Sequence, residues 1–366
     1  MTRIDLAVVG GGIIGLSVAR EAARRGFAVQ LLERDRVGSH ASTAAAGILT
    51  RRGSSHSDRP GREFYLRSLL EYPEWVAAIS RESAQEVPLE EGDDWCLFPH
   101  GPAANRFRSL LETESDPSFW SEEEAPPFGS SKTSSELRCF RIRGERWIDP
   151  LHLVPALHQA AVRCGAEIED SCGRVVVSRD GSGWSIRTSR QTLIARTVVV
   201  AAGPWSDSVL EPLGWKAATV PVRGQLALVP KLHSLNAMVH LEDMLYAVPR
   251  GNWTLVGATM EHGNLEESVT AEGLHALEST LRPLFPNLDI SRAGRTWSGI
   301  RPRTRDKNPH VGWLEPGLAI ASGHFRSGIS TAPRTGRLIA DLLADKDPMP
   351  DASALDPLRS WGWYRD

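Results

Sequence analysis

A glycine-rich turn near the N-terminus constrains the fold of this chain more than any other feature of its sequence. Gly10, Gly12 and Gly15 follow a short β-branched apolar run, and an apolar stretch with helical spacing comes directly after them. A second apolar run then ends at Glu33. The order of strand, glycine turn, helix, strand and acidic residue predicts a βαβ unit that binds a dinucleotide.

Each position in this unit has a physical role in dinucleotide binding. Gly10 permits the tight turn, Gly12 lets a pyrophosphate approach the backbone, and Gly15 lets the helix pack closely on the strand. The free N–H groups at the start of the helix attract the phosphates. Glu33 is expected to accept hydrogen bonds from the adenosine ribose and to repel a 2′-phosphate. These residues leave FAD and NAD as alternatives.

The segment from Ser42 to Ile48 consists of small residues and hydroxyls, and it comes soon after Glu33. Small side chains let the backbone lie against an extended ligand, and Ser42 and Thr43 can donate hydrogen bonds to phosphate oxygens. A loop of this kind fits FAD, because the isoalloxazine ring must be covered. The alternative interpretation is a flexible linker.

Composition excludes several classes of protein. The 366 residues include 42 basic and 45 acidic side chains, so the net charge is −3 and the strongly basic face of a nucleic-acid binder is not expected. The length suggests about two to three domains. The chain has no apolar run of the roughly 18 residues that a membrane span needs. The histidines show no metal-ligand spacing, so no metal is expected.

The cysteines and the N-terminus indicate a cytoplasmic protein. Cys96, Cys139, Cys164 and Cys172 form no CxxC pair and are typical of free thiols in a reducing compartment, although Cys164 and Cys172 could approach each other. The first residues enter an apolar strand directly, without the pattern of a cleavable signal peptide.

Two kinds of sequence alternate along the chain. Patterns typical of a parallel sheet occur at the N-terminus, around residues 147–203 and at the C-terminus, and strand-rich sequence of another kind lies between them. This alternation predicts two domains built from interleaved segments.

Residues 51–62 are polar and turn-rich, which indicates a mobile connection. Residues 112–137 are dense in Glu, Ser and Pro and indicate a surface excursion with little regular structure.

Taken together, the motifs resemble the flavoprotein glycine oxidases of thiamine biosynthesis, within the D-amino-acid oxidase group. Any one block is weak, but the blocks follow the family order and span nearly the whole chain except roughly residues 50–140. The matching blocks are residues 10–15, 33–34, 44–48, 148–150, 198–205, 221–225, 246–250, 257–260, 299–302 and 323–329.

The resemblance implies an α/β fold in which a Rossmann-type FAD-binding domain is interleaved with an antiparallel-sheet substrate domain. We expect residues 1–50, 141–215 and 296–366 in the FAD-binding domain, and residues 51–140 and 216–295 in the substrate domain. Related sarcosine oxidases attach their flavin through a cysteine near the segment that matches residues 299–305. Because no cysteine lies there, the FAD is expected to be non-covalent.

The resemblance also implies roles for individual residues. Arg301 is expected to hold the substrate carboxylate, which suits the bidentate geometry of a guanidinium. Tyr246 adds a hydrogen bond to that carboxylate, Met260 lines the pocket, and Arg326 lies beside the substrate. The helix after Gly328 directs its N-terminal dipole toward the flavin. The residues expected to bind the cofactor are Gly10, Gly12, Ile13, Ile14, Gly15, Glu33, Arg34, Ser42, Thr43, Ala46, Gly47, Ile48, Arg174, Val175, Gly203, His324, Phe325, Arg326, Ser327, Gly328, Ile329 and Ser330.

Other interpretations of single residues stay open. Arg301 before Pro302 is also compatible with a surface turn, and Tyr246 and Met260 are compatible with core packing. His324 beside the flavin loop is as compatible with a structural role as with a base. In the family, an asparagine usually stands where this chain has Ser327, and many relatives carry an aromatic residue in place of Asn264. These differences concern the size and polarity of the amine more than the type of reaction.

The expected reaction is the FAD-dependent oxidation of glycine, sarcosine or a small D-amino acid to a 2-oxo acid, with O2 reduced to H2O2. The motifs supply no obvious side-chain base, so orientation of the substrate should contribute most. The alternatives are a flavin dehydrogenase with another electron acceptor, a tailoring oxidase for a larger amine, and a flavin-carrying binding protein without activity. Relatives are often tetrameric, so a homo-oligomer is possible.

Overall fold

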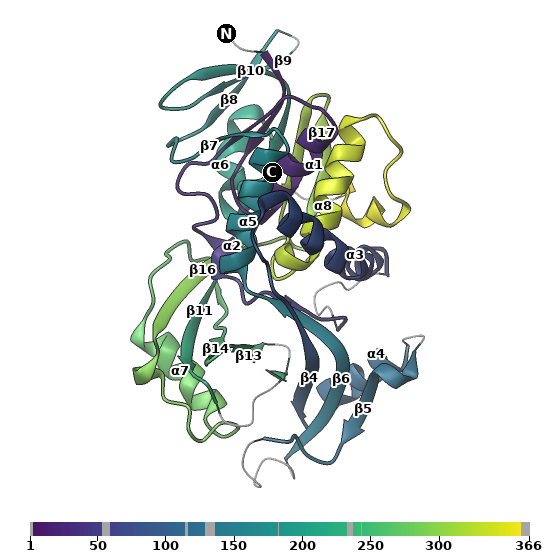
Figure 1. Cartoon of the computed structure of the whole chain (residues 1–366), viewed down its shortest axis with the longest axis vertical. Helices are drawn as coiled ribbons and strands as arrows, with labels where there is room; N and C mark the ends of the chain where they lie inside the picture. The colour runs from purple at the N-terminus through teal and green to yellow at the C-terminus, as the bar shows by residue number, and fades with distance from the viewer. Residues whose placement is uncertain are drawn as a thin grey trace.

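A computed structural model describes residues 3–52, 59–113, 116–128, 136–181, 183–232, 237–242 and 244–359 of the chain. The described residues form two large sheets, which lie in the upper and lower halves of the view in Figure 1. Within the described ranges, no helix combines the length and the apolar character that crossing a bilayer requires. All four cysteines are free thiols, Cys164 and Cys172 included.

The first sheet contains the predicted βαβ unit. Its main path is β17-β18-β10-β1-β2-β7, with the β8–β9 hairpin attached to β10. The central strands β18, β10, β1, β2 and β7 run parallel, and β17 is antiparallel at the edge. The strands are β1 Arg3–Val9, β2 Val29–Leu32, β7 Glu167–Glu169, β8 Val176–Asp180, β9 Gly183–Arg187, β10 Thr192–Val200, β17 His310–Glu315 and β18 Leu318–Ser322.

Helices cover one face of the first sheet. α1, α3, α5 and α8 contact one another and share a single apolar core with the strands. The opposite face packs against α6 and the β8–β9 hairpin. These helices are α1 Ile13–Arg24, α3 Arg59–Ser83, α5 Pro150–Arg163, α6 Ser206–Leu210 and α8 Gly328–Leu343.

The second sheet is mostly antiparallel and follows the order β15-β11-β14-β13-β12-β4-β6-β3, with β16 paired to β11 and β5 paired to β6. Only the β4–β12 pair in it is parallel among the described strands. The strands are β3 Ile48–Leu49, β4 Leu89–Pro99, β5 Trp120–Glu123, β6 Leu137–Ile148, β11 Val220–Pro230, β12 Met238–Leu241, β13 Leu245–Arg250, β14 Trp253–Gly257, β15 Glu261–His262 and β16 Arg295–Arg303. The remaining helices are α2 Ala41–Ala44, α4 Pro102–Glu112 and α7 Ala271–Leu281, with 3-10 turns at Pro117–Phe119, Gly203–Trp205, Glu211–Leu213, Ile290–Arg292 and Pro350–Leu355.

The segments assigned to the two sheets differ in part from the expected boundaries. Residues 141–148 and 296–303 were expected with the first sheet, but they belong to β6 and β16, whose backbone groups pair within the second sheet. α3, expected in the substrate domain, packs instead on α5 and α8, because its apolar side chains complete the core beneath the first sheet. Part of the 112–137 segment forms β5 against β6, and residues 53–58 of the polar 51–62 segment lie outside the described residues.

Candidate functional site

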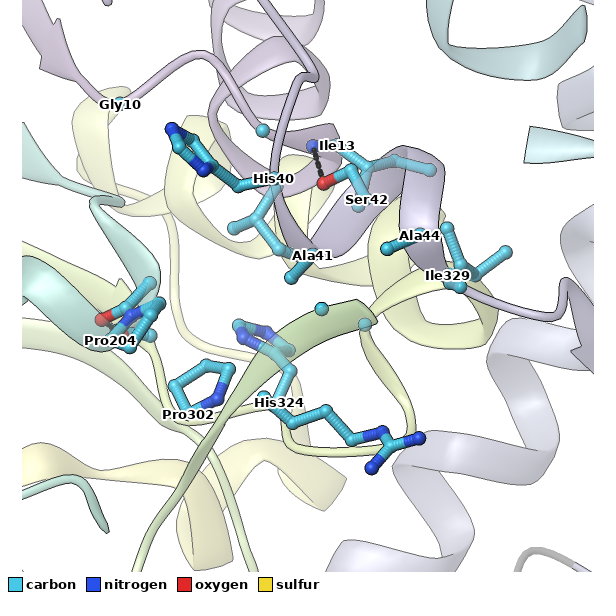
Figure 2. A pocket seen from close by; sticks show the side chains of 18 of the residues that line it. Gly10, Ile13, His40, Ala41, Ser42, Ala44, Pro204, Pro302, His324 and Ile329 are labelled. Carbon is cyan, nitrogen blue, oxygen red and sulfur yellow. Dashed lines mark hydrogen bonds between the residues drawn. The ribbon is translucent and has the colours of Figure 1, made fainter. Parts of the chain in front are cut away.

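A cavity of about 510 Å³ lies between the two sheets. Its wall begins at the glycine turn after β1 and continues to residues of β12, β13 and β16 in the second sheet. Figure 2 shows the glycine turn and Ser42 on one side of this space and Pro302 and His324 on the other. One cavity therefore joins the predicted dinucleotide site to the predicted substrate residues.

The glycine turn has the geometry that its sequence predicts. Gly10 has a φ of +113°, and a Cβ at this position would overlap the carbonyl oxygen of Ala201 at the end of β10. A Cβ on Gly15 would overlap the carbonyl oxygen of Gly10, so α1 approaches β1 at backbone distance. A side chain at Gly10 would push the turn away from the end of β10, and a side chain at Gly15 would push α1 away from the turn. Gly12, Ile13 and Ile14, at the start of α1, line the cavity.

Glu33 is fixed at the end of β2 by two backbone groups. Its Oε2 accepts a hydrogen bond from Gly11 N at 2.6 Å, and its Oε1 accepts one from Asp35 N at 2.8 Å. The side chain is only 8% exposed, yet the residue lines the cavity. A carboxylate has about four lone-pair positions, so these two bonds leave capacity for the hydroxyls of a ribose.

The small-residue segment after Glu33 folds over the start of α1. Ser42 Oγ accepts a hydrogen bond from Ile13 N at 2.9 Å, and its own hydroxyl hydrogen remains available to an anion in the cavity (Figure 2). Thr43 does not line the cavity, because its hydroxyl donates to Gly38 O at 2.7 Å. The expected phosphate donors therefore reduce to Ser42.

The second sheet holds the rest of this segment in place. Trp297 Nε1 donates to Ala44 O at 3.1 Å, and Arg250 donates to Ala46 O and, at 3.1 Å, to Ile148 O. Gly47 has a φ of +67° and accepts a hydrogen bond from Ile148 N at 2.9 Å. The segment is anchored at several points and is not a free linker.

Tyr246 and Arg301 meet at the far end of the cavity. The Arg301 guanidinium lies over Gly224, where a Cβ would overlap it. The Tyr246 ring lies over Gly257, where a Cβ would make a tight contact with it. Arg301 Nη1 also donates to Thr259 O at 3.4 Å. Burial raises the pKa of Tyr246, while the neighbouring Arg301 acts in the opposite direction. The phenol therefore keeps its proton at neutral pH and can donate a hydrogen bond.

The loop before α8 brings Arg326 to the same cavity. Phe325 has a positive φ of +50°, an uncommon conformation for a large residue, and its N–H donates to Pro302 O at 2.8 Å. The Nε2 atom of His324 lies 3.1 Å from Thr335 Oγ1, which favours a structural role for this imidazole. Gly328 starts α8 and lines the cavity, so the helix N-terminus adds partial positive charge there.

Most of the residues expected at the site line the cavity, but five do not. Gly15 and Thr43 are used within the first sheet region, as described above, and Met260 lies just before β15 outside the lining. Ser327 Oγ donates to His324 O at 2.8 Å and Ser330 Oγ donates to Ser327 O at 3.0 Å, so these hydroxyls stabilise the first turn of α8. The expected residues that line the cavity are Gly10, Gly12, Ile13, Ile14, Glu33, Arg34, Ser42, Ala46, Gly47, Ile48, Arg174, Val175, Gly203, Tyr246, Arg301, His324, Phe325, Arg326, Gly328 and Ile329.

Three polar side chains are among the lining residues that the sequence analysis did not name. Arg52, Tyr65 and His240 face the cavity near Tyr246 and Arg326. Arg52 lies in the polar, turn-rich stretch of residues 51–62, Tyr65 lies in a helix with ordinary apolar spacing, and His240 lies on a strand of four residues. The only sequence signal was that His240 and Tyr246 lie six residues apart. A prediction of two strands joined by a turn could have placed both side chains on one face of the sheet.

The wall of the cavity fits FAD. A helix N-terminus, a backbone turn with no room for a side chain and a fixed carboxylate match the pyrophosphate and ribose of a dinucleotide. The cavity then extends past this region to buried tyrosine and arginine side chains, where a redox-active ring and a small anion would meet. No described cysteine lines the cavity, in keeping with a non-covalent cofactor.

Comparison with known proteins agrees with this geometry. The family model described as "DAO: FAD dependent oxidoreductase" matches residues 5–342. The chain is 30% identical to a glycine oxidase of Geobacillus kaustophilus, over 98% of both chains, and 29% identical to a glycine oxidase of Bacillus subtilis, over 94% of both. The crystal structure of a glycine oxidase from Geobacillus kaustophilus superposes with a TM-score of 0.90 at 29% identity, covering 98% of this chain and 99% of that one.

Proposed function

Because the chain belongs to the DAO family of FAD-dependent oxidoreductases, we propose that it oxidises glycine or another small amino acid with O2 as electron acceptor. In this reaction an α-amino acid, O2 and water give a 2-oxo acid, ammonia or an amine, and H2O2. The observation that carries the proposal is the pairing of Arg301 with Tyr246 at the far end of the cavity that begins at the glycine turn.

The FAD supplies the redox chemistry by accepting two electrons from the substrate, and the glycine turn, Glu33 and Ser42 would hold it. The side chains of this chain would bind and orient the amino acid. The Arg301 guanidinium forms a bidentate, charge-assisted pair with the carboxylate, and the Tyr246 hydroxyl donates a further hydrogen bond. Orientation of this kind lowers the entropic part of the barrier.

The charges around the cavity also favour the neutral amine that the reaction requires. Arg301 and Arg326 both line this end, and α8 begins nearby at Gly328. Positive charge close to an ammonium group lowers the pKa of that group. The cavity therefore binds the acid as an anion and assists loss of a proton from its amine.

The test is anaerobic reduction of the purified holoenzyme by a panel of amines. We expect glycine, sarcosine or a small D-amino acid to bleach the flavin absorbance, and subsequent admission of air to restore it with release of H2O2. Bleaching without peroxide, but with reduction of an added quinone, would establish a dehydrogenase instead. Bleaching only by bulkier amines would identify a tailoring enzyme, and FAD that no amine bleaches would refute amine oxidation.

We also propose a cytoplasmic location and, from the resemblance to a family whose members are often tetrameric, a homo-oligomeric state. Four free cysteines support a reducing compartment, and burial raises the pKa of the Cys139 and Cys172 thiols to about 11, which keeps them unreactive. Fractionation of the source cells and light scattering of the purified protein test the two proposals.

A further inference from the structure

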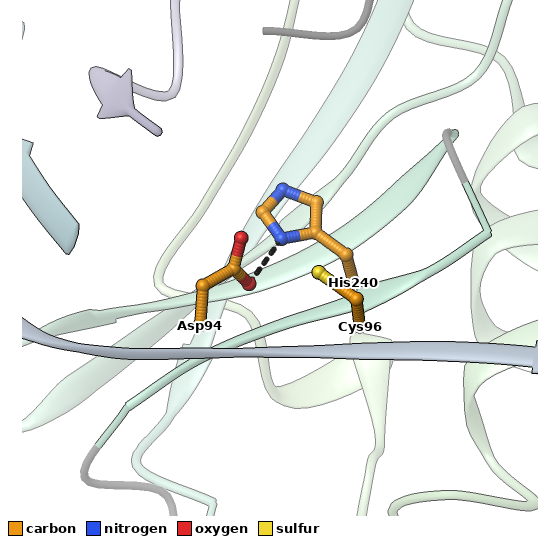
Figure 3. Close-up of side chains that lie close together, drawn as sticks. All are labelled: Asp94, Cys96 and His240. Carbon is orange, nitrogen blue, oxygen red and sulfur yellow. Dashed lines mark hydrogen bonds and ion pairs between the residues drawn. The ribbon is translucent and has the colours of Figure 1, made fainter. Parts of the chain in front are cut away.

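A buried polar cluster lies beside the substrate end of the cavity, on two strands that the function above does not use. Asp94 and Cys96 lie on β4, and His240 lies on the neighbouring strand β12 (Figure 3). His240 pairs across the sheet with Tyr246 on β13, and the two rings are 6.0 Å apart between centroids. Adjacent cross-strand partners share one face of a sheet, so the imidazole and the phenol face the same space.

Asp94 determines which nitrogen of His240 carries the proton. His240 Nδ1 lies 2.6 Å from Asp94 Oδ1, and both side chains are fully buried. Burial lowers the pKa of His240 to about 4, and the charge of Arg52 acts in the same direction. The ring is therefore neutral at pH 7, with its single proton on Nδ1 where it can be donated to the carboxylate.

Arg52 keeps the carboxylate of this pair charged. Its Nε lies 3.3 Å from Asp94 Oδ2, and Arg52 itself is 5% exposed. Burial opposes ionisation of Asp94, but His240 and Arg52 outweigh it and lower the pKa of Asp94 below its ordinary value. The carboxylate and the imidazole thus have fixed roles as acceptor and donor.

The second ring nitrogen of His240 has a lone pair to offer. In Figure 3 it points away from Asp94, and within the described part of the chain it has no hydrogen-bond partner. His240 lines the cavity although bulk solvent does not reach it. A buried polar atom without a partner is costly, so a ligand that supplies an N–H or O–H there gains affinity.

Three charged side chains around this end of the cavity are donors. Arg52, Arg301 and Arg326 carry only N–H groups, whereas the Tyr65 hydroxyl already gives its one proton to Thr50 O at 2.8 Å. Donors satisfy the carboxylate of an amino acid but not its amine. The imidazole Nε2 provides the complementary acceptor.

The cluster is a poor metal site, although ligand atoms of Asp94, Cys96 and His240 lie within 4.8 Å of one another. A guanidinium already lies beside Asp94, and its charge repels a cation. Burial and the charge of Asp94 also raise the pKa of the Cys96 thiol well above its usual value, so the thiolate ligand is disfavoured.

We propose that His240 is a specificity-determining residue whose Nε2 accepts a hydrogen bond from the amino group of the substrate while Arg301 holds the carboxylate. The inference rests on the proposed function, because it assumes that the cavity binds an amino acid. A neutral amine can donate one N–H to Nε2 and keep its lone pair for the oxidation. Asp94 is a positioning residue, which acts by fixing the imidazole.

The test is equilibrium binding of two non-amine acids to the holoenzyme, followed by calorimetry or by the change in flavin absorbance. Glycolate offers an O–H where glycine has its amine, and acetate offers none. We expect wild-type protein to bind glycolate about 3- to 10-fold more tightly than acetate, the range for one net hydrogen bond. His240→Leu should abolish this preference with acetate affinity unchanged, and His240→Gln, which keeps an acceptor, should retain part of it.

Cys96→Ala is the matched control, because Cys96 lies in the same cluster but does not line the cavity; it should keep the wild-type preference. An equal glycolate preference in wild type and His240→Leu would overturn the inference. Failure of wild type to bind either acid would instead refute the carboxylate site of the proposed function. Should His240→Leu not fold, the double variant Asp94→Asn, His240→Leu also removes the negative charge that has lost its imidazole partner, and decides by the same ratio.

Discussion

The guanidinium of Arg301 lies directly over the backbone of Gly224, in space that a Cβ on residue 224 would occupy. The two residues are diagonal neighbours on paired strands, because β11 and β16 align Val222 with Arg301 and Gly224 with Gly299. The absence of a side chain at position 224 therefore gives the arginine its place in the cavity wall.

Gly224→Ala should therefore act as a mild form of an Arg301 variant. The new methyl group displaces the guanidinium, so the carboxylate loses part of a charge-assisted interaction worth about 1.5–3 kcal/mol. We expect KM for the amino acid to rise about 10-fold or more while FAD binding is preserved. Steady-state kinetics and FAD titration measure the two effects.

A double-mutant cycle identifies the cause of that loss. If Gly224→Ala acts through the guanidinium, it should have little further effect on kcat/KM in an Arg301→Ala background. Equal losses in both backgrounds would mean that the methyl group disturbs the sheet itself.

Glu33 should contribute to FAD affinity through the orientation of its carboxylate. Glu33→Ala removes the acceptor for Gly11 N, which leaves a backbone donor of the turn without its partner. We expect the Kd for FAD to rise about 10- to 100-fold, the range for loss of one or two hydrogen bonds to a charged group. Quenching of flavin fluorescence on binding measures the Kd. The exposed Glu86→Gln should leave it unchanged, and an unaltered Kd in Glu33→Ala would show that the carboxylate does not face the cofactor.

The βαβ unit could be predicted from the sequence because its signals are local. The glycines, the apolar runs and Glu33 lie within one continuous stretch. Backbone sterics alone require glycine at the close contacts of the turn. Arg301 and Tyr246 came from the resemblance to a family, since neither residue has an informative local pattern.

The rest depends on contacts between distant strands. His240 meets Asp94, 146 residues earlier in the chain, only because β12 pairs with β4. The same kind of pairing places β16 in the second sheet, where the register with β11 determines its neighbours. Alternating side chains predict that a strand has two faces but not which strand lies beside it. For that reason Arg301, Tyr246 and Arg326 were expected from the sequence, whereas Arg52, Tyr65 and His240 were not.

Glu145 should make the stability of the protein depend on pH. Burial, together with the charge of Asp94, raises its pKa to about 8, against 4.5 for an ordinary glutamate. A carboxyl group whose pKa is raised in the folded state favours folding below pH 4.5, and this contribution is lost as the pH rises through about 8. Glu145→Gln stays neutral, so the variant should gain stability relative to wild type between pH 5 and pH 8.5.

Urea denaturation at the two pH values measures this gain, which we expect to exceed about 1 kcal/mol because one pKa unit corresponds to about 1.4 kcal/mol. The exposed Glu86→Gln should follow the wild-type curve. Parallel curves for Glu145→Gln and wild type would show that the glutamate is ionised in the folded protein.

The C-terminal region is held to α8 by a buried ion pair. Arg334 Nη2 lies 2.7 Å from both carboxylate oxygens of Asp351, and both side chains are almost fully buried. Arg334 also contacts Glu71 on α3 at 2.7 Å, so one guanidinium joins three segments. Removing one partner of a buried pair costs about 3–5 kcal/mol when the other charge is left alone, and less here because Glu71 still contacts the guanidinium.

Asp351→Ala should therefore lower the unfolding midpoint by several degrees and expose the segment after α8 to limited proteolysis. Arg337 provides the comparison, since it contacts the same Glu71 at 2.7 Å but is 43% exposed, and Arg337→Ala should cost less than about 1 kcal/mol. Because α8 begins at the cavity, Asp351→Ala should also weaken FAD binding, whereas Arg337→Ala should not. Equal losses of stability and of FAD affinity in the two variants would mean that the buried ion pair of Arg334 contributes no more than the exposed ion pair of Arg337.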